Sequence, residues 1–295
     1  MTNTLTRRDL FAGAGLSLGA VALIRAGFMP TAAHADGHGD LPPGTVHSFA
    51  SGGVTVHTYV SPAQAVNVTA HVLELGDRLL VVDSTFLPPT AAELGALIES
   101  TGKTVDTAYI SHEHPDHFSG VAALPQIAWQ TLPEIREAIA TEAAAGDGPP
   151  PTALLEGSDL ALGMREIGGV PVEFRAYDAA EAPKTIVTVL PEQRIAVVQD
   201  LVYNGVYFAP GVDRGNWIAT LEGLRDDPAV ETLLVGHGLP TTRGELDTAI
   251  GYLRTLDAAW DAAATPDEVV AAMQSAYPGY GGEFLLGLTQ AYWDK

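Results

Sequence analysis

The stretch His112-Glu113-His114-Pro115-Asp116-His117 places three imidazoles and two carboxylates within six residues of a 295-residue chain. It follows residues 105–111, whose β-branched and apolar side chains predict a strand. A loop at the end of a strand can hold ligands on a rigid scaffold. The chain has no Cys, so disulfides and iron–sulfur clusters are excluded, and any metal must be bound by His and carboxylates. The stretch therefore predicts about half of a metal site.

Further polar side chains follow other predicted strands in the same way. They are Asp83 after residues 79–82, Asp200 after residues 194–198, and His237 after residues 231–235. Strand ends along one edge of a layered α/β fold lie close together. We therefore expect these three side chains to converge with the stretch at residues 112–117.

This pattern resembles that of the metallo-β-lactamase superfamily. The resemblance rests on the motif His-x-His-x-Asp-His after a strand, with Asp200 and Gly236-His237-Gly238 in order downstream. It extends over residues 45–240 and implies an α/β fold, a four-layer αββα sandwich with a one- or two-metal site along its edge. We expect residues 36–295 to form this domain, with helices at its C-terminal end.

The resemblance also implies which residues bind the metals. The ligands would be His112 and His114 for the first metal, Asp116, His117 and His237 for the second, and Asp200 as a bridge between them. Asp83 would hydrogen-bond to the ligands and orient them. Asp116 would in addition orient the attacking water and move its proton.

The chain departs from the family pattern at Glu181, where the family usually has a His. No His lies between His117 and His237, so no shift of the alignment restores one. A carboxylate is an acceptable zinc ligand, and we predict that Glu181 binds the first metal. If Glu181 is instead an exposed turn residue, the first site is weak or empty, and Asp178 is the alternative ligand.

The expected function is a hydrolase that uses a metal-bound hydroxide on a small ester, lactone, lactam or thioester, with one or two Zn²⁺ ions. Two His and a carboxylate also suit Fe²⁺, so an iron oxygenase of the sulfur-dioxygenase type is an alternative. A third alternative is an exported protein that binds a metal or ligand without catalysis. Tyr203, Trp217 and Lys184 are candidates for the substrate pocket, although core packing explains the aromatic residues equally well.

The N-terminal residues have the pattern of an export signal. Arg7-Arg8 precede an apolar run at residues 10–24, and Ala33-His34-Ala35 supplies small residues for cleavage. Residues 1–35 resemble a signal of the twin-arginine type, which predicts a periplasmic or secreted protein. The run is shorter than the roughly 18–20 residues of a spanning helix. We expect no stable membrane association after cleavage; an uncleaved anchor is the alternative.

The net charge also limits the class of partner. The chain has 15 Lys and Arg against 36 Asp and Glu, a net charge of −21. Nucleic acids and anionic membranes are bound by basic surfaces, so neither is an expected partner. The composition fits a protein that acts on a small molecule.

Overall fold

The computed structural model describes residues 41–145, 148–208 and 210–293. The predicted signal peptide, residues 1–35, lies outside the described residues. In the part of the chain that is described, no helix is both long and apolar enough to cross a membrane.

The first sheet is built from the N-terminal part of the chain and has the strand order β1-β2-β3-β4-β5-β6. Its strands are β1 Thr45–Ser51, β2 Val54–Val60, β3 Thr69–Leu75, β4 Arg78–Val82, β5 Thr104–Tyr109 and β6 Trp129–Gln130. The pairs from β1 to β4 are antiparallel, whereas β5 lies parallel to both β4 and β6. Since β4 and β5 are parallel neighbours, the residues that follow them meet at one edge of the sheet.

The second sheet comes from the later part of the chain, in the order β12-β11-β10-β9-β8-β7. Its strands are β7 Gly163–Ile167, β8 Val170–Asp178, β9 Lys184–Leu190, β10 Ile195–Tyr203, β11 Thr232–His237 and β12 Thr241–Thr242. Here β10 and β11 are the parallel pair, and the other neighbours are antiparallel. Residues that follow or end β10 and β11 therefore share an edge as well.

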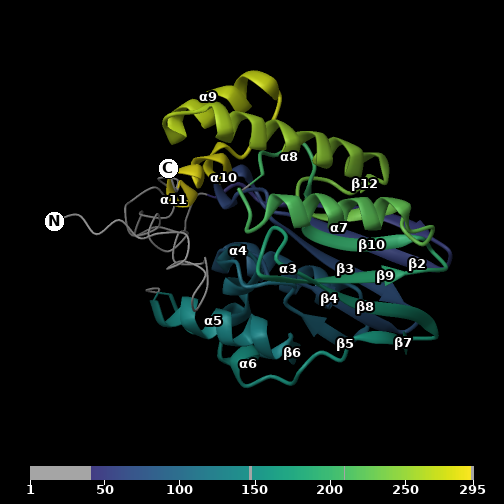
Figure 1. Cartoon of the computed structure of the whole chain (residues 1–295). Coiled ribbons are helices and arrows are strands. Elements are labelled where there is room, and N and C mark those ends of the chain that lie inside the picture. The colour runs from purple at the N-terminus through teal and green to yellow at the C-terminus, as the bar shows by residue number, and fades with distance from the viewer. Residues whose placement is uncertain (1–40, 146–147, 209, 294–295) are drawn as a thin grey trace.

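Helices cover the outer face of each sheet (Figure 1). The helices after the first sheet's strands are α3 Pro88–Ser100, α4 Pro115–Phe118, α5 Pro133–Ala145 and α6 Thr152–Leu155, with 3₁₀ turns at Ala63–Ala65 and Ser119–Ala123. Those of the second half are α7 Arg214–Asp226, α8 Gly244–Ala262, α9 Pro266–Ala276, α10 Glu283–Gly287 and α11 Thr289–Tyr292. The predicted four-layer αββα sandwich is confirmed.

The core between the two sheets explains why they pack together. Tyr109 of β5 meets Phe174 of β8 edge-on, with ring centroids 5.7 Å apart, and its hydroxyl lies 2.7 Å from the Thr188 hydroxyl of β9. A second core, which includes Leu221 of α7 and Leu253 of α8, fills the space under the outer helices. The central strands β4, β9 and β10 are buried along nearly their whole length, as burial on both faces of a strand requires.

Three elements differ from the expectation. The strand expected to end at Val198 continues to Tyr203, with an irregular register from Val197 onward. The apolar residues 284–293 predict one helix, whereas the structure has two short helices, interrupted at Leu288 directly after Gly287, a poor helix former. The sequence also predicts a helix that begins at Gly120, whereas the structure has only a 3₁₀ turn there.

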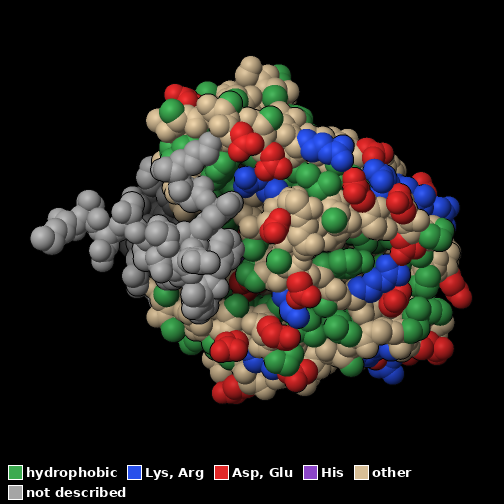
Figure 2. Space-filling view, in the orientation of Figure 1, with side chains coloured by type: hydrophobic (Ala, Val, Ile, Leu, Met, Phe, Trp, Pro, Cys, Tyr) green, Lys and Arg blue, Asp and Glu red, His purple; other side chains and the backbone are tan. Residues whose placement is uncertain are grey.

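The surface seen in Figure 2 carries acidic side chains spread over most of the described part, with basic ones interspersed among them. Many of the basic groups are paired, as Arg175 is with Asp227 and Arg214 is with Asp257. Each such pair contributes little to stability where it is exposed.

Candidate metal centre

The stretch at residues 112–117 changes from extended chain to helix at its middle. His114 has extended backbone angles and Pro115 begins α4, a position where proline is favoured because its N–H is not needed. His112 and His114 therefore lie on the extended part, and Asp116 and His117 lie in the first helical turn. This bend directs the two pairs of side chains to two neighbouring sets of ligand atoms.

The first set joins His112 and His114 to two carboxylates of the second sheet. One ligand atom from each of His112, His114, Glu181 and Asp200 lies within 4.8 Å of the others. The Nδ1 of His114 is 3.5 Å from Oε2 of Glu181, and Nε2 of His112 is 3.7 Å from Oδ2 of Asp200. Two imidazoles and two carboxylates at these separations could surround one divalent ion.

Glu181 is fully buried, so it is not an exposed turn residue. The turn between β8 and β9 directs it inward: Ala179 has a left-handed φ of 47°, and Ala180 N donates to Ala182 O at 3.1 Å. Burial, reinforced by the charge of Asp200, raises the pKa of the Glu181 carboxyl well above its usual range. Asp178, the alternative ligand, has a 73% exposed side chain paired with Lys184 and does not reach the site.

The second set consists of Asp116, His117 and His237, whose ligand atoms also lie within 4.8 Å of one another. The Nε2 of His237 is 3.3 Å from Oδ2 of Asp116. Asp200 contacts this set too, because Oδ1 is 3.1 Å from Nε2 of His117 and Oδ2 is 3.4 Å from Nε2 of His237. Asp200 thus lies between the two sets, where a bridging ligand would be expected.

Four of these groups bury a polar atom without a hydrogen bond among the described residues: Nε2 of His117, Nε2 of His237, Oδ1 of Asp200 and Oε2 of Glu181. Buried polar atoms normally form hydrogen bonds, and a buried polar atom without one destabilises the folded protein. All four belong to the two sets. A cation bound between them would satisfy them, so the residues present fit one or two metal ions.

The carboxylates of the site favour a positively charged partner. Burial alone lowers the pKa of His237, but Asp200 and Asp116 outweigh burial and raise it to about 9. Burial likewise favours a neutral Asp200, yet the charges of His117 and His237 hold the pKa of that carboxyl well below its usual range. In the metal-free protein, protons on these imidazoles therefore supply the positive charge that a metal ion would otherwise bring.

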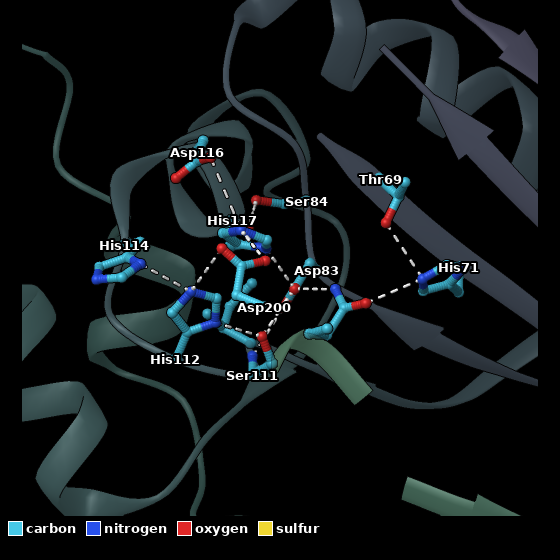
Figure 3. Close-up of polar contacts among 12 residues, drawn as sticks. Thr69, His71, Asp83, Ser84, Ser111, His112, His114, Asp116, His117 and Asp200 are labelled. Carbon is cyan, nitrogen blue, oxygen red and sulfur yellow. Dashed lines mark hydrogen bonds and ion pairs between the residues drawn. The ribbon is translucent and has the colours of Figure 1, made fainter. Parts of the chain in front are cut away.

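Asp83 positions the ligands through hydrogen bonds that involve both of its carboxylate oxygens. Its Oδ1 accepts from Ser111 N at 2.7 Å, and its Oδ2 accepts from Ser111 Oγ at 2.8 Å and from His117 Nδ1 at 2.8 Å. Figure 3 shows Asp83 between Ser111 and His117. Because Nδ1 of His117 donates to Asp83, Nε2 is the nitrogen that faces the site. His237 is fixed in the same way by Val66 O, 2.8 Å from its Nδ1.

Gln199 and His71 extend this network, which the sequence did not predict. The Gln199 amide nitrogen donates a short bond to Asp83 Oδ2, and its amide oxygen lies 2.9 Å from Nε2 of His71. That nitrogen also lies 3.1 Å from Val235 O; since both partners are acceptors, Nε2 carries the proton. Burial lowers the pKa of His71 to about 4, so it stays neutral. The feature of the sequence that could have indicated this role for Gln199 is its position directly before Asp200.

Gly236 leaves room for Asp200. A Cβ added at Gly236 would lie 1.7 Å from Oδ1 of Asp200, far inside any allowed contact. The glycine beside His237 is therefore a packing requirement of the site.

A pocket opens beside both sets, and its polar end is formed by His114, Asp116, Asp200 and Tyr203. Tyr203 lies there as expected; its hydroxyl donates to Asp200 Oδ2 at 2.9 Å, and its ring stacks on His237 at 4.9 Å. The other two candidates do not line the pocket. Trp217 is fully buried under β10, with Nε1 donating to Leu201 O at 3.0 Å.

Lys184, the third pocket candidate, lies at the start of β9 and points to other carboxylates. Its Nζ is 3.1 Å from Asp178 and 3.3 Å from Glu134. It therefore pairs with acidic side chains near the turn between β8 and β9, and it is not among the described residues that line the pocket.

The model of the metallo-β-lactamase superfamily matches residues 63–239, more than half of the chain. The chain belongs to the metallo-β-lactamase superfamily. No curated protein sequence matches it significantly. Solved structures of this superfamily share its fold: DIM-1 metallo-β-lactamase exposed to ceftazidime is 14% identical, with 73% of this chain and 99% of that one covered and a TM-score of 0.57.

Two further structures have the same fold. The mono-zinc form of FIM-1 from Pseudomonas aeruginosa is 20% identical over 72% of this chain and 96% of its own, with a TM-score of 0.55. A metallo-β-lactamase from Pontibacter korlensis is 19% identical over 71% and 99%, also at 0.55. At these identities the likeness supports the fold of this superfamily member and leaves its substrate open.

The role of Gln199 can be tested with Gln199→Leu. Removing the amide leaves Asp83 without one donor and frees His117 to turn, so we expect zinc affinity to fall about 10- to 100-fold. Competition with a chromophoric chelator measures the change. Gln193→Leu, whose amide bonds only to Gly52 O far from the site, is the control. Equal zinc affinities in the two variants would contradict this role.

The packing requirement at Gly236 can be tested with Gly236→Ala. The added methyl would displace Asp200, so we expect a loss of about 1–3 kcal/mol of stability together with weaker zinc binding. Chemical denaturation and metal titration measure the two effects. Gly223→Ala is the matched control, since nothing lies within 4 Å of that Cβ and alanine favours a helix. A Gly236→Ala protein with unchanged stability and affinity would refute the clash.

Proposed function

We propose that this protein is a metal-dependent hydrolase that binds zinc at one or two adjacent positions and acts on a small ester, lactone, lactam or thioester. The observation that carries the proposal is the convergence of four unsatisfied buried atoms, those of His117, His237, Asp200 and Glu181, on one place. Buried polar atoms that lack a hydrogen bond fit a cation, and the donor types fit zinc.

The proposed division of ligands follows the two sets of side chains. His112, His114 and Glu181 hold one ion, Asp116, His117 and His237 hold the other, and Asp200 contributes to both. A bound zinc ion would supply a Lewis acid and bring the pKa of a water near 7, where hydroxide is available at neutral pH.

The chain's own residues supply positioning and proton transfer. Asp116 lines the pocket and keeps 15% of its side chain exposed, so its carboxylate can meet both a substrate and a water. We assign to it the transfer of the water proton toward the leaving group. Tyr203 donates to Asp200 and so holds the bridging carboxylate while the substrate binds against the aromatic ring.

The export signal predicted for residues 1–35 supports a periplasmic or secreted location. Export in the folded state, as the twin-arginine pattern implies, would allow the metal to be loaded before the site meets competing metals outside. We propose a small-molecule substrate as the partner, in keeping with the acidic composition.

An iron oxygenase is the second candidate, and the observation that favours it is the buried position of Glu181 beside His112 and His114. Two His and one carboxylate are the ligands of many mononuclear iron(II) oxygenases. The complete second set, with Asp116, His117 and His237, favours the hydrolase, since a single iron leaves that set without a purpose.

Elemental analysis of the purified protein, followed by assays with esters, lactones and β-lactams, tests the proposal. We expect zinc, hydrolysis that stops on chelation, and no oxygen uptake. His112→Ala should reduce turnover by at least about 100-fold, because one ligand of the first ion is lost. Iron with oxygen uptake would establish the second candidate, and full turnover by His112→Ala would rule out a metal hydrolase.

We expect Glu181→Gln to have a favourable effect on the stability of the metal-free protein and an unfavourable effect on zinc binding. Burial and the charge of Asp200 hold the pKa of the Glu181 carboxyl in the folded protein above that of an ordinary glutamate, so the folded state keeps a proton that the unfolded chain loses. Stability of the metal-free protein therefore falls as pH rises above that value. We expect Glu181→Gln to stabilise the metal-free protein at pH 8 and to weaken zinc binding more than about 100-fold.

Thermal unfolding with and without zinc, from pH 5 to pH 8, measures both effects. Glu192→Gln, at an exposed turn position, is the matched control and should change neither. If Glu181→Gln binds zinc as tightly as the wild type does, Glu181 is not a ligand.

A further inference from the structure

The pocket beside the ligand residues has an apolar wall opposite its polar end. The wall is formed by Val66, Phe86, Phe284, Leu285, Leu288 and Tyr292. Phe284, Leu285 and Tyr292 belong to α10 and α11, and Leu288 lies between these two helices. Both helices lie on the same side of the molecule as α4 (Figure 1). A substrate whose reactive group lies at Asp116 and Asp200 would therefore place the rest of its structure against the C-terminal helices.

Backbone hydrogen bonds fix this wall relative to the ligands. Val206 forms a parallel bridge with Gly281; Tyr207 N donates to Gly281 O at 2.8 Å, and Gly281 N donates to Gly205 O at 3.0 Å. Residues 205–207 follow β10, the strand that carries Asp200. The wall is therefore attached to the same strand as the bridging carboxylate, and its distance from the ligands is set by the fold.

The pocket offers no positive side chain to a substrate. Among the described residues that line it, none is Lys or Arg. The carboxylates of Asp116 and Asp200 lie at its polar end instead. A carboxylate on the bound substrate would be desolvated opposite these acids without a partner, which disfavours it.

We propose that this pocket binds an uncharged ester or lactone through an aliphatic acyl chain laid against α10 and α11. The inference rests on the proposed hydrolase function, whose substrate class it narrows. In the reaction the oxygen of water bonds to the acyl carbon and the acyl carbon–oxygen bond breaks. One water proton passes to the alcohol oxygen, by way of Asp116, and the acid product ionises by releasing the other.

A series of p-nitrophenyl esters, from acetate through butyrate to hexanoate, tests the proposal with the zinc-loaded full chain. We expect kcat/KM to rise with chain length, by up to about fourfold for each methylene that becomes buried. A monoester of a dicarboxylic acid of equal length should be at least about tenfold poorer. If acetate is hydrolysed but chain length has no effect, or the anionic ester is preferred, the inference is overturned and the hydrolase function stands.

Phe284→Arg supplies the missing positive charge at the wall. We expect this variant to improve the anionic ester relative to the neutral one by about tenfold or more. Leu162→Arg is the matched control, since Leu162 is 49% exposed and lies outside the pocket; it should keep the wild-type preference. Unchanged preference in Phe284→Arg would mean that the wall does not select against charge.

Binding without turnover separates the pocket from the chemistry. Calorimetry on the chelator-treated protein should detect octanamide and find octanoate weaker. If octanoate binds as tightly as octanamide, the inference is wrong even where esters are hydrolysed. If octanamide binds more tightly but the zinc-loaded protein hydrolyses no ester, lactone, lactam or thioester, the preference of the pocket for an uncharged apolar ligand is upheld and the hydrolase function fails.

Discussion

The carboxylate of Asp83 is the group on which the rest of the site depends. It is fully buried and accepts hydrogen bonds from Ser111 at the end of the first sheet, from His117 in α4 and from Gln199 in the second sheet. A buried charge is tolerated only when such donors surround it. The strand end after β4, the motif loop and β10 are therefore held at one point, and the side chains they carry are held with them (Figure 3).

Neither sheet contains a complete set of ligands. His112 and His114 follow the first sheet, whereas Glu181 and Asp200 belong to the second; Asp116 and His117 in turn meet His237 of β11. The ligand atoms come together only when the two sheets have packed. Metal binding at this place would consequently be coupled to folding of the whole sandwich, because the unfolded chain lacks a formed site.

Much of this arrangement could be predicted from the sequence, for identifiable reasons. The motif at residues 112–117, Asp200 and His237 each come at or near the end of a strand, and parallel neighbours bring such ends together. What could not be predicted depends on contacts across the fold. Trp217 is turned into the core by α7, Gln199 acts only through its contact with Asp83, and the burial of Glu181 follows from a turn with a left-handed residue.

The C-terminal helices have a consequence for how relatives of this chain diverge. Among the residues that line the pocket, those of α10 and α11 contribute apolar surface and no ligand atom. Their sequence can therefore change while the donors of the site stay the same. Under the proposed function, relatives that share the His-x-His-x-Asp-His motif could therefore keep the same metal ligands and still differ in the substrate that fits against this tail.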